Sequence, residues 1–336
     1  MGTGAITILL QSLSIGYKHG RGRRVVAEGI NAQVAAGELT CLLGANGIGK
    51  STLLRTLTGS QPRLGGGVLL LGKELAEYSA RALARCIAVV LTERPALHNM
   101  TAEELVSLGR SPYTGYWGRL TEHDQTMVRQ SLEQVGIVHL AQRMLDTLSD
   151  GERQKSMIAK ALAQDTPIVL LDEPTAFLDF PSKVEMMRLL YELSRSTNKT
   201  IFMITHDLEL ALQIADKIWL MDSNAKLHIG TPEDLALRGD LQRFFTRKGI
   251  AFDASSGLFR VDYPVVRTIG MEGSGVRLAM VRKALRRKGI AGVSLGESQE
   301  KVNVEEGRPI RYTSPLGISR EVENIEGLLD LLDGRA

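Results

Sequence analysis

The 336-residue chain has few of the features that mark secreted or membrane-embedded proteins. Its two cysteines, Cys41 and Cys86, lie in apolar runs without the spacing of a metal site. We therefore expect buried thiols in a reducing compartment. No run of about 18 apolar residues is present, so no membrane-spanning helix is expected. Residues 1–11 also lack the basic start and long apolar stretch of a secretory signal.

Strong charge and repetition are missing as well. The formal net charge of +3 is too small to argue by itself for nucleic-acid binding. The sequence has no internal repeat, low-complexity tract or heptad run, which excludes solenoid and coiled-coil proteins. Its hydrophobic content of 43% is ordinary for a globular protein, and its length suffices for two domains.

Short apolar runs alternate with helical patterns over most of the chain. This alternation predicts an α/β fold with helices packed on a parallel sheet. Between residues 91 and 148 the pattern is helical only, which predicts a helical insert. The expected strands are 6–10, 39–43, 87–91, 168–171, 201–204 and 218–221, and the expected insert helices are 101–108, 122–135 and 140–145.

The pattern changes again near residue 248. We expect a first domain over residues 1–247 and a small C-terminal α+β domain of unknown role over residues 248–336. A glycine-rich run at 270–275 precedes a basic helical pattern, and it is either a turn or a site for phosphate or another small ligand. The expected strands are 258–261, 265–269 and 309–313, and the expected helices are 276–288 and 325–332.

A phosphate-binding pattern follows the second expected strand. Residues 44–51 read G-x-x-x-x-G-K-S, and a helical pattern follows them. The glycines let backbone N–H groups turn towards a di- or triphosphate, and a helix start favours negative charge. Lys50 would reach the β- and γ-phosphates, and the Ser51 hydroxyl would bind Mg²⁺. The residues expected to bind nucleotide here are Gly44, Asn46, Gly47, Gly49, Lys50, Ser51 and Thr52.

Two acidic residues end another apolar run. Residues 168–171 read as a buried parallel strand, and Asp172 and Glu173 follow it at the end where open α/β sheets bind ligands. Phosphoryl transfer requires positioning and neutralisation of charge. We expect Asp172 to hold Mg²⁺, directly or through water, and Glu173 to orient or deprotonate the attacking water.

A third motif lies between the phosphate loop and this acidic strand. Residues 148–154 read L-S-D-G-E-R-Q. In that position they resemble the signature of the ATP-binding cassette (ABC) family, which is usually Leu-Ser-Gly-Gly-Gln. Three further positions resemble family elements. Tyr17 is similar to the aromatic residue that stacks on adenine, Asp179 to the D-loop aspartate, and His206 to the switch histidine that contacts the γ-phosphate.

The resemblance covers about residues 5–245. It implies a P-loop NTPase cassette with a helical subdomain at about residues 95–165. It also implies ATP and Mg²⁺ as cofactors, with Lys50, Glu173 and His206 as catalytic residues. In the family two copies form a head-to-tail dimer. Ser149 and Gly151 of one copy would then cap the ATP bound by the other.

The helical insert resembles one subgroup of the family more closely. It reads L-G-R-S-P-Y at 108–113 and W-G-R-L-T at 117–121, followed by Asp124. This is similar to the ATPases of iron-siderophore, haem and cobalamin importers, in which the insert receives the coupling helices of a membrane permease. Three aromatic residues suit such a partner surface better than a helix core: Tyr113, Tyr116 and Trp117.

This likeness implies an ATPase subunit that energises uptake through a permease. Its partners would include an external substrate-binding protein but no nucleic acid, and it would lie peripherally on the cytoplasmic face of the cell membrane. An exporter ATPase or a metal-ion importer stays open. An ABC protein of DNA repair or ribosomes is a further alternative, but those usually carry two cassettes or a long coiled coil.

Two positions depart from the family pattern. Thr92 stands where the family has a glutamine after the third strand. We expect Thr92, alone or with neighbouring Glu93, to take over the coupling to the permease, with Thr92 contacting Mg²⁺ through water. Asp150 and Glu152 place carboxylates in the signature, where they would weaken an ATP-driven dimer. Locally, however, residues 149–152 fit a capping box at the start of a helix to about residue 164.

Overall fold

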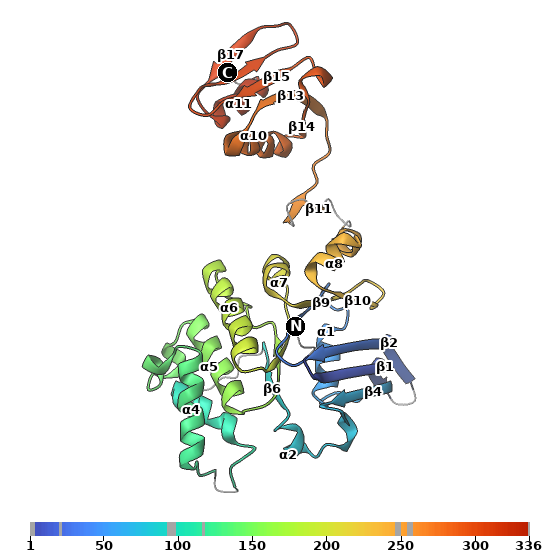
Figure 1. Cartoon of the computed structure of the whole chain (residues 1–336), viewed down its shortest axis with the longest axis vertical. Coiled ribbons are helices and arrows are strands. Elements are labelled where there is room, and N and C mark those ends of the chain that lie inside the picture. The colour runs from blue at the N-terminus through green and yellow to red at the C-terminus, as the bar shows by residue number, and fades with distance from the viewer. Residues whose placement is uncertain are drawn as a thin grey trace. The chain divides into compact units, whose positions relative to one another are not determined.

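The computed structural model describes residues 4–19, 22–92, 99–115, 118–245, 250–253 and 258–334. The chain forms two compact units, Met1–Phe244 and Phe245–Ala336 (Figure 1). Glu93, Tyr116 and Trp117 lie outside the described residues, so their expected roles stay predictions. Among the described residues, no helix is both long and apolar enough to cross a membrane.

The centre of the first unit is a six-stranded sheet, in which all strands but the edge strand β10 run parallel. Five expected strands are confirmed here, and most of their apolar residues are buried because other elements pack on the sheet. In order across the sheet the strands are β10 (Leu227–Gly230), β9 (Lys217–Met221), β3 (Leu39–Gly44), β8 (Thr200–Ile204), β7 (Ile168–Asp172) and β6 (Ile87–Val90).

A second, antiparallel sheet contains the expected strand 6–10 within a longer strand. The sequence did not indicate the other three strands, because β2 has a largely exposed, polar pattern and β4 begins with three glycines, which strands disfavour. The strand order is β2 (Gly22–Ala35), β1 (Ile6–His19), β4 (Gly65–Leu70) and β5 (Lys73–Glu74).

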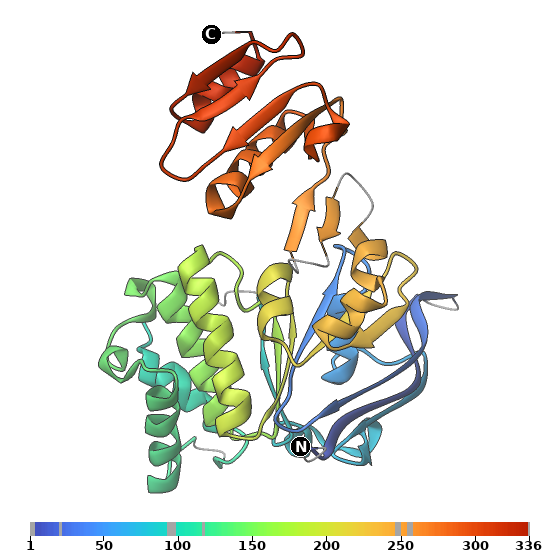
Figure 2. The ribbon, with the colours of Figure 1, turned by 45° about the horizontal axis from the view of Figure 1, so that its top comes forward.

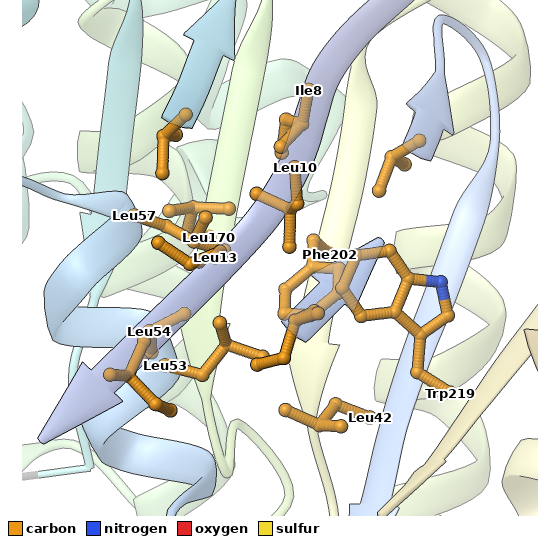
Figure 3. Close-up of a cluster of buried hydrophobic side chains, with 14 of the residues drawn as sticks. Ile8, Leu10, Leu13, Leu42, Leu53, Leu54, Leu57, Leu170, Phe202 and Trp219 are labelled. Carbon is orange, nitrogen blue, oxygen red and sulfur yellow. The ribbon is translucent and has the colours of Figure 1, made fainter. Parts of the chain in front are cut away.

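The main hydrophobic core lies between these two sheets, and helix α1 (Lys50–Leu57) packs into it (Figure 3). Leu53 and Leu54 of α1 are at most 1% exposed, so the helix that follows the phosphate loop is anchored by burial. Beside them, the rings of Phe202 and Trp219 meet edge to face, with centroids 5.0 Å apart. This packing fixes the phosphate loop at the carboxyl end of the central strand β3.

Helices of the insert gather on one side of the first unit (Figure 2). The expected helices are confirmed as α3 (Ala102–Ser107) and α4 (Glu122–Gln134), each opened by a capping box. The expected helix at 140–145 is wrong: only short 3-10 turns, Val138–Leu140 and Leu145–Thr147, occur there. Carbonyl groups of this stretch instead accept from the first N–H groups of α3, as Arg143 O does from Ala102 N.

The signature helix α5 (Asp150–Ala163) begins with the expected capping box. Ser149 Oγ accepts from Glu152 N, and the Glu152 carboxylate accepts from Ser149 N at 2.8 Å. The bond from Ser149 N, together with one from the Ser149 hydroxyl to the same carboxylate, holds the pKa of Glu152 below its usual range. A buried ion pair, Arg110 Nε to Asp124 Oδ1 at 2.8 Å, joins α4 to the insert loop, and Arg110 also donates to Ala163 O at the end of α5.

Among the described residues, five further helices complete the first unit, and α6, α7 and α8 each follow a strand of the six-stranded sheet. Two short helices follow β10, because Arg238 caps the first and Gly239 takes a positive φ between them. The elements are α2 (Ala80–Leu83), α6 (Phe180–Ser196), α7 (Leu208–Ile214), α8 (Pro232–Leu237) and α9 (Asp240–Phe245).

The second unit has its own sheet and core. Strands β13, β14 and β15 are parallel, and β16 and β17 continue the sheet antiparallel. One helix, α10 (Gly275–Arg287), packs its apolar face on the sheet, and α11 (Ile325–Leu332) matches the expected range. Strands β11 (Ile250–Asp253) and β12 (Leu258–Val261) pair antiparallel in a separate two-stranded sheet. The sheet strands are β14 (Ile290–Val293), β13 (Arg267–Gly273), β15 (Lys301–Val304), β16 (Ile310–Thr313) and β17 (Ser319–Val322).

Candidate ATP-hydrolysis site

The phosphate loop joins β3 to α1 and leaves the start of that helix open. Gly49 is the N-cap of α1 at φ 118°, a conformation that other residues rarely adopt. A Cβ at Gly49 would also lie 2.3 Å from Val26 Cγ1, so glycine alone fits. The first N–H groups of α1 have no side-chain cap, and they are available to a phosphate.

Lys50 lies folded over the same loop. Its Nζ donates to Gly44 O at 2.8 Å and to Ala45 O at 2.9 Å. Partial burial lowers the pKa of Lys50, while the nearby carboxylates of Glu173 and Asp172 oppose that shift. The ammonium therefore faces both the loop and the acids, as a group that bridges phosphate oxygens must.

A cavity of about 740 Å³ opens above the loop. It brings together nine of the residues expected from sequence: Tyr17, Asn46, Gly47, Gly49, Lys50, Ser51, Thr52, Glu173 and His206. The Tyr17 hydroxyl lies 2.9 Å from Thr52 Oγ1, which ties the aromatic ring to α1. Arg24 and Val26 also line the cavity. The sequence did not indicate them, since only the pairing of Tyr17 with Arg24 across β1 and β2 places them there.

The acidic end of β7 meets the end of β8 at the cavity. Glu173 has a positive φ of 50°, unusual for a residue with a side chain, and its N–H donates to Ile204 O. The His206 Nε2 and Glu173 Oε1 atoms are 2.6 Å apart. Burial, together with neighbouring Glu173, raises the pKa of Asp172, so this carboxylate is poised to gain from a cation.

Thr92 lies at the end of β6, next to the acidic strand. Its Oγ1 donates to the backbone O of Asp172 at 2.7 Å. The hydroxyl proton is therefore committed to the protein, and only the lone pairs of the oxygen remain for a metal-bound water. The expected contact of Thr92 with Mg²⁺ stays a prediction.

Ser149 and Gly151, which are expected to cap the ATP of a second copy, lie outside the cavity, and so does Asp179, which resembles the D-loop aspartate. Ser149 caps α5, and Gly151 stands in the first turn of that helix. Asp179 caps α6 by accepting from Ser182 N, and hydrogen bonds from the side chain and the backbone of Ser182 lower the pKa of Asp179. These positions leave the cavity of one chain incomplete if they act in catalysis, and their role stays a prediction.

Comparisons with known proteins agree with this geometry. A family model described as ABC transporter matches residues 27–176. An uncharacterized ABC transporter ATP-binding protein of Methanocaldococcus jannaschii is 41% identical over 251 residues, which are 75% of this chain and 85% of that protein. The chain belongs to the ABC transporter ATP-binding proteins.

Other members of the ABC family show the same likeness. The achromobactin transport ATP-binding protein CbrD of Dickeya dadantii is 39% identical over 228 residues, 68% of this chain and 83% of that protein. Among solved structures, cbiO1 of Clostridium perfringens, part of the ABC transporter complex cbiONQ, has a TM-score of 0.62 at 28% identity. That match covers 71% of this chain and 94% of the other.

Family and cavity together identify the reaction. The expected fold, an α/β P-loop cassette of the ABC type, is confirmed. The chain is an ATPase, because it belongs to a family whose members hydrolyse ATP.

Proposed function

We propose that this ATPase energises an importer for iron-siderophore complexes, with haem and cobalamin as the other cargoes compatible with its insert. Two observations support the proposal. CbrD, a relative at 39% identity, is named for transport of achromobactin. The insert sequence at 108–121 resembles the corresponding region of that importer subgroup. The exporter and metal-ion importer alternatives have no such support from the residues of this chain.

In the proposed reaction the chain's own residues bind and position ATP. Tyr17 stacks on adenine, the N–H groups at the start of α1 hold phosphate oxygens, and Lys50 neutralises their charge. Glu173, held near His206, orients or deprotonates the attacking water, and His206 contacts the γ-phosphate. All four of these side chains line one cavity, which supports their joint action on one nucleotide.

Mg²⁺ fits two residues near this nucleotide cavity: Ser51, which lines it, and Asp172, which precedes the lining residue Glu173. The Ser51 hydroxyl and the Asp172 carboxylate are hard oxygen donors, and two such ligands leave positions for water and phosphate oxygens, as Mg²⁺ prefers. The raised pKa of Asp172 has the same implication, since a cation would compensate for its burial. Bound there, the ion would neutralise charge on the phosphates.

The proposed partners follow from the incomplete cavity and the insert. A second copy of the chain would supply Ser149 and Gly151 to the bound ATP. A membrane permease would contact the insert near Tyr113, and an external binding protein would deliver the cargo. The chain would then lie peripherally on the cytoplasmic face of the membrane.

We also propose that residues 248–336 form a regulatory domain or one that steadies the dimer. Its separate core supports an independent role. Removal of residues 250–336 should change the oligomeric state or the transport rate. Unchanged values of both would contradict a regulatory or dimer-stabilising role.

Growth on defined iron sources tests the proposed cargo. A strain that lacks this gene should fail to use an iron-siderophore as sole iron source, and the wild-type gene should restore growth. The Glu173→Gln gene should not restore it, although the variant protein is made. The importer proposal would be overturned if the deletion strain grew normally with a siderophore complex or haem as sole iron source and with cobalamin as sole source of that vitamin.

A further inference from the structure

Next to His206, one carboxylate is held by side chains from two other segments of the chain. Asp207 follows His206 directly, and its two oxygens have separate partners. Lys183 Nζ, from the second turn of α6, contacts Asp207 Oδ1 at 2.7 Å, and the Thr175 hydroxyl donates to Oδ2. All three side chains are largely shielded, since Lys183 and Asp207 are 28% and 20% exposed and Thr175 is buried. We refer to Lys183, Thr175 and Asp207 as the Asp207 clamp.

The clamp acts on a tight turn that contains His206. Asp207 has φ −81° and ψ 74°, and Leu208 N donates to His206 O at 3.0 Å. These values describe an inverse γ-turn centred on Asp207. The backbone of His206 is therefore the first part of a turn whose central side chain is fixed at both oxygens.

Because its carboxylate binds Lys183 and Thr175, Asp207 does not make the usual N-cap hydrogen bond. It stands at the N-cap of α7, where an aspartate side chain normally accepts from the first N–H groups of the helix. No such bond forms here. Its own N–H donates to Thr205 Oγ1 at 3.0 Å, so main chain and side chain are both held outside the capping geometry. The carboxylate is used to join loops and not to start a helix.

The two loops that the clamp joins are those that carry the catalytic pair. Thr175 lies two residues after Glu173, and Ala176 N donates back to Glu173 O. The Thr175–Asp207 bond and the His206–Glu173 contact therefore connect the same two loops. Lys183 adds a third anchor from α6, whose N-cap is Asp179.

We propose that Lys183, acting through Asp207, is a positioning residue that sets the place of the His206 side chain against Glu173. The proposal rests on the catalytic role proposed above for His206. Lys183 has no place in the nucleotide cavity, so it should affect the chemical step and not the binding of ATP.

Steady-state ATP hydrolysis by the full chain tests this role. Lys183→Met keeps the length of the side chain and removes its charge, and we expect kcat to fall about tenfold with the KM for ATP changed by less than about twofold. Lys183→Arg should recover kcat to within about threefold of wild type, because it can still reach the carboxylate. Melting temperatures of all variants report folding.

The chain offers a matched control for Lys183→Met. Lys217 pairs with Glu38 at 3.2 Å, and their exposures of 32% and 21% are close to those of Lys183 and Asp207. Lys217 lies at the start of β9, at the opposite end of the sheet from the catalytic loops. Lys217→Met should therefore leave kcat unchanged. An equal loss of kcat in both variants would overturn the positioning role and leave a general effect of losing an ion pair.

His206→Gln separates this proposal from the one it rests on. If His206→Gln alone keeps wild-type kcat, the catalytic role of His206 fails. If it lowers kcat while Lys183→Met does not, the clamp fails and the role of His206 stands. If the catalytic role of His206 and the positioning role of Lys183 are both correct, Lys183→Met should cause no further loss of kcat in the His206→Gln background.

Discussion

Among the described residues, two glycine-rich turns from strand to helix have different surroundings. In the first unit, Gly49 leads from β3 into α1, and no side chain caps the helix start. The cavity above it is lined by Lys50, Glu173 and His206. Lys50 donates to two carbonyl groups of its own loop, contacts that it can exchange for phosphate oxygens.

The second turn leads from β13 through Ser274 into α10. Its helix start is covered by the chain itself, since Arg277 N lies 3.4 Å from Glu306 Oε1. The Arg277 guanidinium donates to the carbonyls of Glu305 and Glu323. Gly273 allows close contact with β15, because a Cβ there would lie 2.1 Å from Val304 O.

The contrast shows why a glycine pattern before a helix does not by itself define a phosphate site. Both turns need glycine, the first because Val26 approaches and the second because a neighbouring strand does. At α1 the helix start stays open to a ligand. At α10 the carboxylate of Glu306 already supplies the negative charge that a helix start favours. The structure thus favours a turn at 270–275 over the alternative of a phosphate site.

The largest expected effect separates the cations of the two turns. Lys50→Met should lower ATP hydrolysis at least about 100-fold, because one preorganised charge at the phosphates is lost. Arg277→Met removes a cation of the second turn and should leave kcat and the KM for ATP unchanged. Steady-state hydrolysis by the full chain measures both. Similar losses in the two variants would break the comparison.

Gly273→Ala should destabilise the second unit by about 3 kcal/mol, because the added methyl group would overlap β15 and the backbone would keep a strained φ of 130°. Hydrogen exchange of residues 267–322 in the full chain would measure it. Gly296→Ala is the control in the same unit, since nothing lies within 4 Å of the point where its methyl group would stand. Equal exchange in both variants would contradict the close approach seen at Gly273.

Arg24 sharpens the description of the open turn. It lines the nucleotide cavity as the cross-strand neighbour of Tyr17. Arg24→Gln should raise the KM for ATP about fivefold with little change in kcat, because a cation beside the nucleotide aids binding. Arg23 is the control, since adjacent residues of a strand point to opposite faces. Arg23→Gln should behave as wild type, and an equal rise in KM would argue for a general effect of surface charge.

The smallest expected effect concerns the covered turn. Glu306→Gln keeps the shape of the side chain but removes its charge from the start of α10, which should cost about 0.5–1 kcal/mol of stability in the second unit. Chemical denaturation of the full chain, monitored by hydrogen exchange in α10, measures this cost. A gain in stability would show that Glu306 does not serve as the anion at this helix.

Local signals predicted much of the cassette. The capping box at Ser149 predicted the start of α5, and the apolar run before Asp172 predicted β7, because each feature is written in adjacent residues. The helix expected at 140–145 failed, since bonds to α3 compete with helix formation there.

The parts that the sequence did not predict depend on contacts between distant residues. Arg24 reaches the cavity only through the pairing of β1 with β2. Lys183 meets Asp207 only because α6 packs beside the end of β8, a separation of 24 residues. No local pattern carries such information, so these residues were found only from the fold.

Titration of the full chain with ADP and Mg²⁺ by calorimetry tests the central contrast most directly. ADP probes phosphate binding without hydrolysis. We predict one nucleotide per chain, lost in Lys50→Met and retained in Arg277→Met. A second nucleotide per chain, or binding that survives in Lys50→Met and disappears in Arg277→Met, would contradict the assignment of the ATP site to the turn before α1.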